Sequence, residues 1–346
     1  MKVVGLGAGL TDPATRFRIL SHLQLFQDKG HEAYFQSFSL PKFGIPDSGV
    51  NAFLKPTHIP LLYYWDFFRL IEKMPILWSY LTNDIIFLNR MLIPCHITYE
   101  RLIYSKLVFD FDDAIWLGEG KGKMPEIMEN SKLVFAGNQY LLDYAKQYNG
   151  HSSHLIPTPV DTKLYAPIQH RSDQFIVGWI GTSSNFHFLE RVYPFVVAFL
   201  KSYPQVEFRI MSNESPTFIQ GESANVTFQY WTKEKEIPFI QALTVGLMPL
   251  QNDEWSKGKC SYKMLQYMSC GVPVLVSPFG MNQELLDKGE IGLGIEKYVD
   301  WYDALVYMYQ NKGDKLRNMG AAGRRIVEEE FDLDMINDKI LTLLTT

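Results

Sequence analysis

The residues best suited to binding a phosphate lie in the stretch WSKGKCSYKMLQYMSC, from 255 to 270. Lys259, Lys263 and Gln266 are spaced i, i+4 and i+7, which predicts one shared face of a helix. Two ammonium groups at this spacing repel each other, and a bound anion turns that repulsion into attraction. A solvated lysine face is the alternative. The position beside a glycine at a strand-to-helix junction favours a phosphate or pyrophosphate site.

A second candidate ligand loop opens the chain, in MKVVGLGAGLTDPATRFR. Gly5 and Gly7 fit the first two positions of a dinucleotide fingerprint, but Leu10 stands where the third glycine belongs. We therefore do not expect NAD here. Two interpretations stay open: a loop in which Gly7 and Gly9 let the backbone approach another ligand, and a plain strand-to-helix turn.

The elements that must position these residues alternate between strand and helix along the whole chain. The expected strands are KVVGL, EAYFQSF, DIIFL, KLVFDF, KLVFA, SHLIP, FIVGWIG, VEFRIMS, NVTFQYW, VGLMPL and VPVLVS. Continuous apolar strands between helices predict parallel sheets covered on both faces, an α/β fold. Among the helices, residues 14–30 carry an apolar stripe. The members of this stripe are Phe17, Leu20, Leu23 and Leu25.

Prolines interrupt the alternation in LIPTPVDTKLYAP, which indicates a linker. We expect two Rossmann-like domains: residues 1–160, and residues 161–331, with a C-terminal helix at about 332–346 that packs back on the first. Ligands of such sheets bind beyond the C-terminal ends of the strands. The loop GWIGTSS, with Gly181 and Thr182, is therefore predicted to face one cleft together with the opening loop.

Composition excludes several classes of protein. A net charge of −5 argues against a nucleic-acid surface, and three cysteines form no disulfide framework. We expect a cytoplasmic protein. The aromatic stretch at 61–80 carries charges and an interior proline, so it is not predicted to span a bilayer. It suits peripheral contact with the inner face of a membrane or a lipid-linked partner, and a helical hairpin packed on its own domain is the alternative.

One segment resembles a known family. KMLQYMSCGVPVLVSPFGMNQEL is similar to the nucleotide-sugar-binding segment of retaining glycosyltransferase family 4 (glycosyl transferases group 1), which has the GT-B fold. The family pattern reads roughly E-A-M-A-x-G-x-P-V-V, then a glycine-containing loop and an acid. LIPTPVDTKLYAP looks like the family's linker, IVGWIGT like its first C-domain strand, and DPATRFRILSHLQLFQDKGHE like its first N-domain helix. The resemblance covers nearly the whole chain.

The resemblance implies transfer of a sugar from a nucleotide diphosphate-sugar to a glycan or lipid-linked acceptor, with retention and with no metal or other cofactor. Gln266 occupies the position of the family's second glutamate, which binds the donor ribose. Gly258 stands where the first glutamate belongs, and SSNFHF lacks the family's arginine–lysine pair. We infer that Lys259 and Lys263 neutralise the diphosphate instead.

The remaining site residues follow from the same resemblance. Gly181 and Thr182 are expected to donate hydrogen bonds to the donor, and Asn282 and Glu284 to hold its sugar. On the N-domain side, Gly7 and Gly9 are expected to form the opposite wall of the cleft, with Arg16 just inside the helix that follows.

An acidic cluster in VFDFDDAIW leaves alternatives open. Asp112 and Asp113 follow an apolar strand, and adjacent carboxylates raise one another's pKa, which suits a cation or proton transfer. They either contact an acceptor hydroxyl or cap the next segment. Asp110 and Asp112 also match the D-x-D pair of metal-dependent GT-A enzymes, an interpretation we disfavour because the chain has two lobes. The histidines show no metal-ligand spacing, so no metal site is predicted.

The missing glutamate and arginine keep other classes of function open. A non-catalytic sugar-nucleotide or glycan-binding protein is one, and a GT-B epimerase or phosphorylase is another. Consumption of the donor separates the first from an enzyme, and the products formed separate the second.

Overall fold

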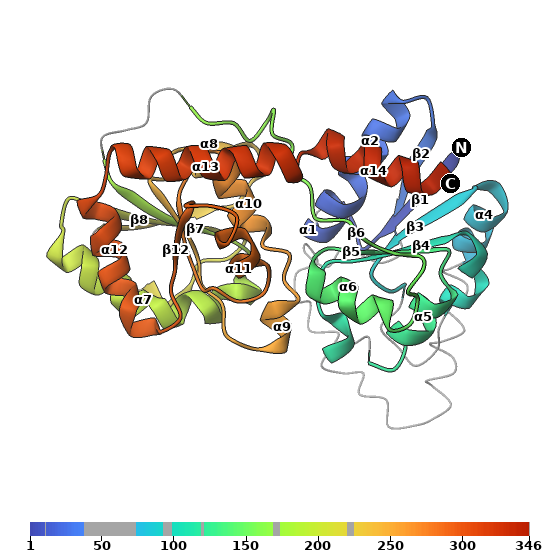
Figure 1. Ribbon diagram of the computed structural model, residues 1–346, viewed down its shortest axis with the longest axis horizontal. Coiled ribbons are helices and arrows are strands. Elements are labelled where there is room, and N and C mark those ends of the chain that lie inside the picture. The colour runs from blue at the N-terminus through green and yellow to red at the C-terminus, as the bar shows by residue number, and fades with distance from the viewer. Residues whose placement is uncertain are drawn as a thin grey trace. The chain divides into compact units, whose positions relative to one another are not determined.

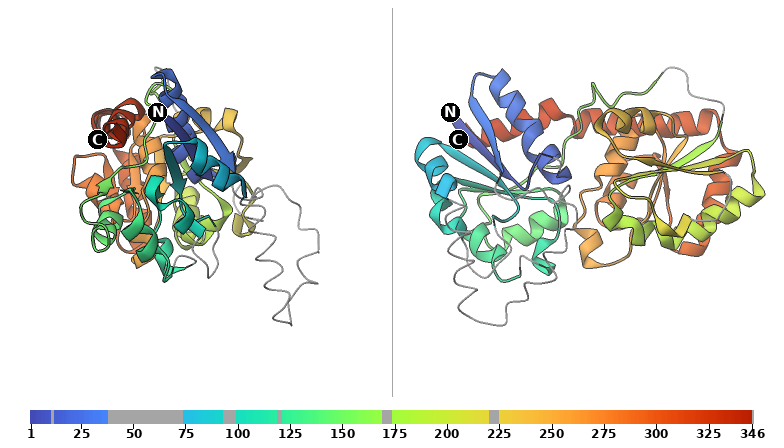
Figure 2. Two further views of the ribbon diagram at one scale, coloured as in Figure 1. Left: turned by 90° about the vertical axis from the view of Figure 1, so that its right-hand side faces the viewer. Right: turned by 180° about the vertical axis from the view of Figure 1, so that it is seen from behind.

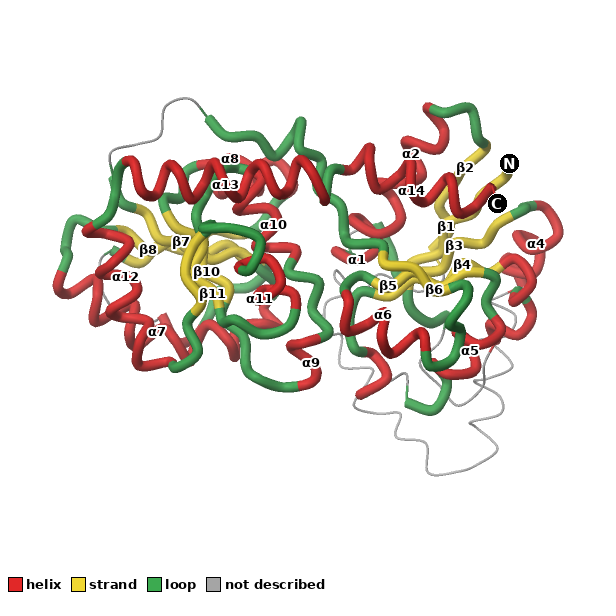
Figure 3. Tube along the Cα trace, viewed as in Figure 1, coloured by secondary structure: helices red, strands yellow, loops and turns green. Residues whose placement is uncertain are grey.

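The computed structural model describes the greater part of the chain. The described residues are 1–10, 12–37, 74–92, 99–118, 121–168, 174–219 and 225–345. Two compact units arise, one from residues 1–158 with 336–346 and one from residues 159–335. Each unit contains a six-stranded sheet, drawn yellow in Figure 3, with helices around it. Neighbouring strands run parallel throughout, so the predicted α/β fold with parallel sheets is confirmed.

The first sheet has the order β2-β1-β3-β4-β5-β6 (Figure 1). Its strands are β1 (Lys2–Gly7), β2 (Glu32–Ser37), β3 (Ile85–Asn89), β4 (Leu107–Phe111), β5 (Leu133–Ala136) and β6 (Ser153–Leu155). The apolar strand sequences predicted above place this sheet correctly to within two residues at each end. The order changes direction between β1 and β3, and the loops that leave these two strands therefore lie at the switch point where α/β sheets bind ligands.

The helix after β1 contains a π-helical turn. The segment consists of α1 (Pro13–Thr15), the π-helical turn Arg16–Leu20 and α2 (Ser21–Asp28). The buried positions of the segment, which include Ile19, Leu23 and Phe26, nevertheless recur at intervals of three and four residues, as in a regular helix. The predicted stripe is therefore wrong in phase, because Phe17, Leu20 and Leu25 are only half-buried. Arg18 lies on the buried face.

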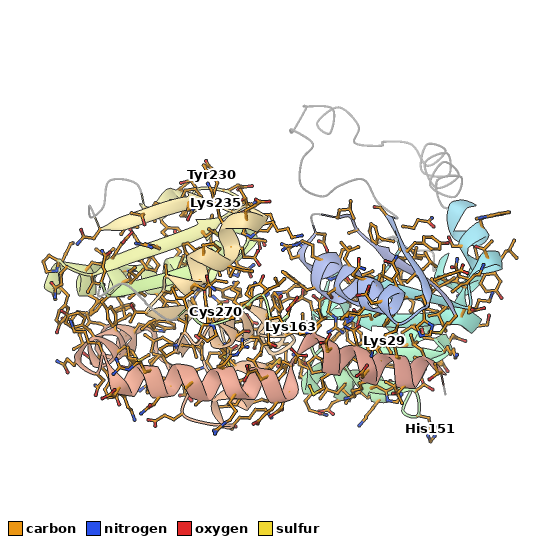
Figure 4. The ribbon with its side chains drawn as sticks, turned by 90° about the horizontal axis from the view of Figure 1, so that it is seen from above. Lys29, His151, Lys163, Tyr230, Lys235 and Cys270 are labelled. Carbon is orange, nitrogen blue, oxygen red and sulfur yellow. The ribbon has the colours of Figure 1, made fainter. Side chains whose placement is uncertain are left out.

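Helix α14 (Leu333–Thr345) completes the first unit from the far end of the chain. Ile336, Ile340 and Leu344 belong to the same core cluster as β1 and β3. Asn337 Oδ1 lies 2.8 Å from Nδ1 of the buried His22, and Asp338 pairs with Lys29, which Figure 4 labels beside this helix. The other helices of the unit are α4 (Met74–Thr82), α5 (Met124–Asn130) and α6 (Gln139–Lys146).

The second sheet has the order β12-β11-β10-β7-β8-β9. Its strands are β7 (Ile176–Ile180), β8 (Glu207–Ser212), β9 (Val226–Tyr230), β10 (Val245–Met248), β11 (Val274–Val276) and β12 (Gly292–Gly294). The strand β12 is not among those predicted, because its glycines carry no apolar signal. This order places the switch point between β7 and β10, so the loop after β7, which begins at Gly181, stands where ligands bind.

Helices cover both faces of the second sheet, as Figures 1 and 2 show. α7 (Phe186–Ser202) and α12 (Trp301–Gln310) pack together on one face. α8 (Lys233–Gln241), α10 (Tyr262–Ser269) and α13 (Asp314–Glu330) pack on the other. The short helices α9 (Glu254–Lys257) and α11 (Met281–Leu286) flank the loops at the ends of β10 and β11.

No described helix has the length and apolar character needed to cross a membrane. The aromatic stretch at 61–80 is described only from residue 74 onward, and its earlier part lies outside the described residues. The expectation of membrane or lipid contact therefore stays a prediction.

Candidate functional site

The loop after β7 brings a lysine against bare backbone. A Cβ built on Gly181 would lie 2.8 Å from both Cε and Nζ of Lys263, and 2.8 Å from the Trp179 ring. Any other residue would force this side chain to move, so glycine is required here for the lysine to approach the strand end. Gly181 and Lys263, both predicted site residues, are thus placed together at the switch point of the sheet.

Lys263 has an unusual electrostatic environment. Its Nζ lies 4.7 Å above the centre of the Trp179 ring, and within the described residues no carboxylate or hydrogen-bond acceptor pairs with it. Burial, with a smaller contribution from the charge of Lys259, lowers the pKa of Lys263 to about 7. A cation held in this way is stabilised by an anion that takes the place of the missing carboxylate.

The predicted helical face is wrong for Lys259. Helix α10 begins at Tyr262, and Ser261 before it has a left-handed backbone with φ of 51°. Lys259 therefore lies in the preceding turn, where its Nζ is 5.8 Å from the Phe188 ring and 5.7 Å from the Trp255 ring. Its charge still reaches Lys263, as the lowered pKa shows. Spacing alone could not reveal the break at Ser261, although serine is a common helix N-cap and was the one local signal for it.

Thr182 braces the loop after β7. Its hydroxyl lies 2.8 Å from Ser184 Oγ and accepts a hydrogen bond of 2.8 Å from Asn185 Nδ2. Asn213, which follows β8, accepts a hydrogen bond of 2.8 Å from the Ser183 amide. The loop is therefore held in shape by its own side chains before any ligand arrives.

Asn282 ties α11 to the turn before α10. Its side chain is fully buried, accepts a hydrogen bond of 2.7 Å from Ser261 Oγ and donates one of 2.9 Å to the Ser277 carbonyl. Its contact with a donor sugar stays a prediction. Glu284, two residues later, is exposed in the first turn of α11.

Gln266 lies on the buried side of α10. Its Nε2 donates to Glu236 Oε1 at 2.9 Å and to Tyr165 Oη at 3.1 Å. Sequence reasoning missed both partners, which come from α8 and from the linker segment. At the position of the family's second glutamate, a carboxylate is thus supplied by another helix, as Glu236 of α8.

The opening glycine loop of the first unit is closed by its own side chains. A Cβ on Gly7 would lie 2.5 Å from Thr15 Oγ1, and that oxygen accepts a hydrogen bond of 3.1 Å from the Ala8 amide. Asp12 caps the helix by accepting from the Thr15 amide at 2.9 Å, and Gly9 has φ of 149°. These contacts explain the glycines as a tight strand-to-helix turn. A ligand contact of this loop stays a prediction.

The first unit fully buries the cation Arg18, which sequence reasoning missed in favour of Arg16. Arg18 forms a two-pronged ion pair with Asp110, with Nε to Oδ2 at 3.0 Å, and donates to the Ile156 carbonyl at 2.6 Å. Asn89 Nδ2 also donates to Asp110, at 2.8 Å. Arg16 lies half-buried with its guanidinium 4.7 Å above the Phe17 ring.

These contacts do not favour the D-x-D interpretation. Asp110 is fully buried within β4 and is engaged by Arg18, whereas Asp112 lies beyond the strand and pairs with Arg90. The two carboxylates are therefore held by different arginines instead of converging on one ion. Within the residues that the structure describes, no group of three histidine, cysteine or acidic side chains could hold a metal.

Arg90 neutralises the acidic cluster. Its Nε lies 3.1 Å from Asp112 Oδ1 and its Nη2 lies 2.6 Å from Asp113 Oδ2. Burial alone would raise the pKa of Asp112, but Arg90 and Arg18 outweigh it and hold that pKa below its ordinary value. The prediction that the neighbouring acids raise one another's pKa is therefore wrong for Asp112. Arg90 itself has a left-handed backbone with φ of 64°, at the end of β3.

Residues 174–311, within the second unit, match the family model described as glycosyl transferases group 1. The chain is a glycosyltransferase with the GT-B fold. No curated protein sequence matches the chain significantly.

Solved glycosyltransferase structures share the fold along the full chain. Sucrose-phosphate synthase from Thermosynechococcus elongatus is 15% identical with a TM-score of 0.72, over 99% of this chain and 98% of that one. Anabaena HepE in complex with UDP-glucose is 14% identical with a TM-score of 0.68, over 100% and 99%. The E. coli trehalose-6-phosphate structure bound with UDP-2-fluoro glucose is 12% identical with a TM-score of 0.68, over 99% of each chain.

Proposed function

We propose that this glycosyltransferase is a retaining enzyme of family 4 that moves a sugar from a nucleoside diphosphate to a glycan or lipid-linked acceptor, without a metal ion. Two structural neighbours hold UDP-glucose and UDP-2-fluoro glucose, which makes UDP the first nucleotide to test. We assign donor binding to residues 159–335 and acceptor binding to residues 1–158. We place the enzyme in the cytoplasm, in reach of a lipid-linked acceptor at the inner face of the membrane.

The observation that carries this proposal is the lysine at the end of β7. Lys263 is half-buried, lacks an acidic partner among the described residues, and is pressed against Gly181. A diphosphate supplies the negative charge that this site lacks. As the bond between the sugar and the diphosphate lengthens, charge builds up on the leaving group, and cations already in place stabilise it more than they stabilise the ground state.

Neighbouring residues fit the same assignment. Lys259 adds a second positive charge near enough to lower the Lys263 pKa. The Gln266 amide supplies an acceptor for a donor hydroxyl, and exposed Glu284 lies on the first turn of α11 for the sugar. In the first unit, Asp112 keeps its charge through Arg90, so Asp112 and Asp113 can accept a hydrogen bond from an acceptor hydroxyl.

The test of donor binding is a thermal-shift series with UDP, GDP and ADP and their glucose conjugates. A ligand that binds only the folded state raises its melting temperature. We expect UDP and UDP-glucose to give the largest shift, and uridine, which has no phosphate, to give none. A protein that no nucleoside diphosphate stabilises would overturn the proposed function.

The test of the reaction follows released UDP and the anomeric proton of the product. We expect α-linked product from an α-linked donor, at a rate that EDTA does not change. β-linked product would contradict retention, and activity lost in EDTA and restored by manganese would contradict metal independence.

One observation favours a second candidate, a non-catalytic donor-binding protein. Gly258, at the position of the family's first glutamate, is buried and carries no acid. Binding of UDP-glucose without any release of UDP, across a broad panel of acceptors, would support this candidate over the transferase.

A further inference from the structure

A buried polar cluster joins three segments of the second unit. It is centred on Glu236 of α8, which is 3% exposed. This carboxylate accepts hydrogen bonds from Tyr165 Oη, from Trp231 Nε1 and, at 2.9 Å, from Gln266 Nε2. Figure 4 shows Tyr230 at the outer edge of the sheet, and the next residue, Trp231, turns its ring nitrogen inward to this cluster. Three donors on one buried carboxylate make a rigid arrangement.

The cluster fixes the orientation of the Gln266 amide. Nε2 donates to Glu236 Oε1 at 2.9 Å and to Tyr165 Oη at 3.1 Å, and because Tyr165 Oη is itself hydrogen-bonded to Glu236 Oε1, both acceptors lie on one side of the amide. Within the described residues, Oε1 accepts no hydrogen bond, and it is not among the enclosed polar atoms that lack a partner. The amide oxygen is therefore left open as an acceptor, on the side opposite to Glu236.

Gln266 and Lys263 are neighbours on the surface of α10. Gln266 follows Lys263 by three residues, and side chains three apart are neighbours on a helix surface. An acceptor for hydroxyl hydrogens and a cation for phosphates thus lie about one helical turn apart. A nucleoside diphosphate carries its ribose hydroxyls and its phosphates at a matching separation.

We propose that Glu236 is a positioning residue, which locks the Gln266 amide so that its oxygen accepts a hydrogen bond from the ribose hydroxyls of the donor. This inference rests on the proposed donor binding. It also explains why an amide stands at 266. A glutamate there would put a second carboxylate about 2.9 Å from Glu236, where like charges repel.

If the side chains at 236 and 266 are exchanged, every hydrogen-bond donor in the cluster still has an acceptor. In the double variant Glu236→Gln with Gln266→Glu, the new amide at 236 donates to the new carboxylate at 266 and to Tyr165. The Tyr165 hydroxyl then donates to residue 266, and Trp231 donates to the amide oxygen at 236. The oxygen facing the ribose remains an acceptor. Either single exchange, by contrast, leaves an unpaired donor or two facing carboxylates.

The experiment compares the binding of UDP with that of 2′,3′-dideoxy-UDP by isothermal titration calorimetry. We expect the wild-type chain to prefer UDP by about tenfold, the worth of about one hydrogen bond. Glu236→Gln and Gln266→Glu should each reduce this preference to less than about threefold and lower the melting temperature. The double variant should restore both. Gln310→Glu, the same change at the exposed end of α12, is the control and should alter neither.

The outcomes separate this inference from the function on which it rests. A wild-type chain that binds neither nucleotide overturns the proposed function. A chain that binds both equally well, or a double variant that regains its melting temperature but not its preference for UDP, overturns the role of Glu236 while leaving diphosphate binding intact. Only recovery of the preference for UDP over 2′,3′-dideoxy-UDP in the double variant supports the inference.

Discussion

The two units begin in the same way and treat their positive charge differently. In each, a strand at the switch point of a parallel sheet leads through a glycine into a helix: β1 into α1, and β7 into α7. In the first unit the cation behind the loop, Arg18, is fully buried and bound by Asp110. In the second unit the cation, Lys263, has no acidic partner within the described residues. On the proposed function, the first loop is completed by the protein itself and the second by the bound donor.

The physical chemistry of the two cations supports this distinction. A guanidinium matches a carboxylate with two parallel hydrogen bonds, so Arg18 and Asp110 satisfy each other without water. An ammonium is a compact charge whose pKa moves readily on burial, as that of Lys263 does. The first arrangement contributes to structure, and the second is held ready for an anion.

The largest expected effect comes from breaking the satisfied pair. Asp110→Asn leaves the Arg18 charge buried without its partner, and we expect a loss of about 3–5 kcal/mol in the free energy of unfolding. Urea denaturation followed by tryptophan fluorescence measures this loss. The double replacement Arg18→Met with Asp110→Leu should recover most of it. Equal losses in the single and the double variants would show that the charge pair is not the cause.

The second-largest effect is expected from removing the charge of Lys263. We expect Lys263→Met to weaken UDP binding by about a hundredfold, about 2.7 kcal/mol, because a charge-assisted contact to phosphate is lost. The same change should raise the stability of the free protein by about 1 kcal/mol, because a desolvated charge is removed. Lys201→Met, at an exposed position of α7, should change neither quantity. If Lys263→Met left the affinity for UDP unchanged, the contrast drawn between the cations of the two units would be wrong.

The pH dependence should separate the two effects of this lysine. Its pKa is about 7 in the folded chain, below the ordinary lysine value of about 10.4, so the cost of burying the charge is fully present below pH 7. Between these values the folded chain holds fewer protons than the unfolded chain, and the stability of the free protein should rise with pH. UDP needs the charged form, so its affinity should fall by up to tenfold per pH unit above 7. Calorimetry at pH 6 to 9 checks both trends, and both should flatten in Lys263→Met.

The smallest effect concerns the closed loop of the first unit. Asp12 caps the helix through the Thr15 amide, so Asp12→Ala should cost about 1 kcal/mol of stability and leave UDP affinity unchanged. Asn185, which precedes α7, makes no capping bond, and Asn185→Ala should cost less. A clear loss of UDP affinity in Asp12→Ala would mean that the opening loop also touches the donor.

The sequence predicted the fold well because the fold rests on local patterns. Buried parallel strands are continuous apolar runs, and these runs placed all the strands except β12. Its sequence, Gly-Leu-Gly, pairs with β11 through backbone alone, and a Cβ on Gly292 would clash with the Val274 backbone. Such a strand has no side-chain signal to detect.

The candidate site was predicted in part, and the errors have physical causes. Lys263 and Gly181 lie together as expected because both belong to well-formed elements at the switch point. Lys259 was misplaced because the left-handed Ser261 breaks the helical period. Arg18 was missed because its partner Asp110 is distant in sequence, and an arginine on a buried helix face has no local signal. Long-range pairing of this kind leaves no trace in residue spacing.

Helix α14 has a consequence for how the chain is made. Residues 1–158 leave a ribosome before residues 159–335, yet the core that receives Ile336, Ile340 and Leu344 stays uncovered until α14 has emerged. By then the second unit already has all of its own segments. The first unit is therefore completed after the second, and during that interval α14 does not shield His22 and the apolar side chains around it from water or from chaperones.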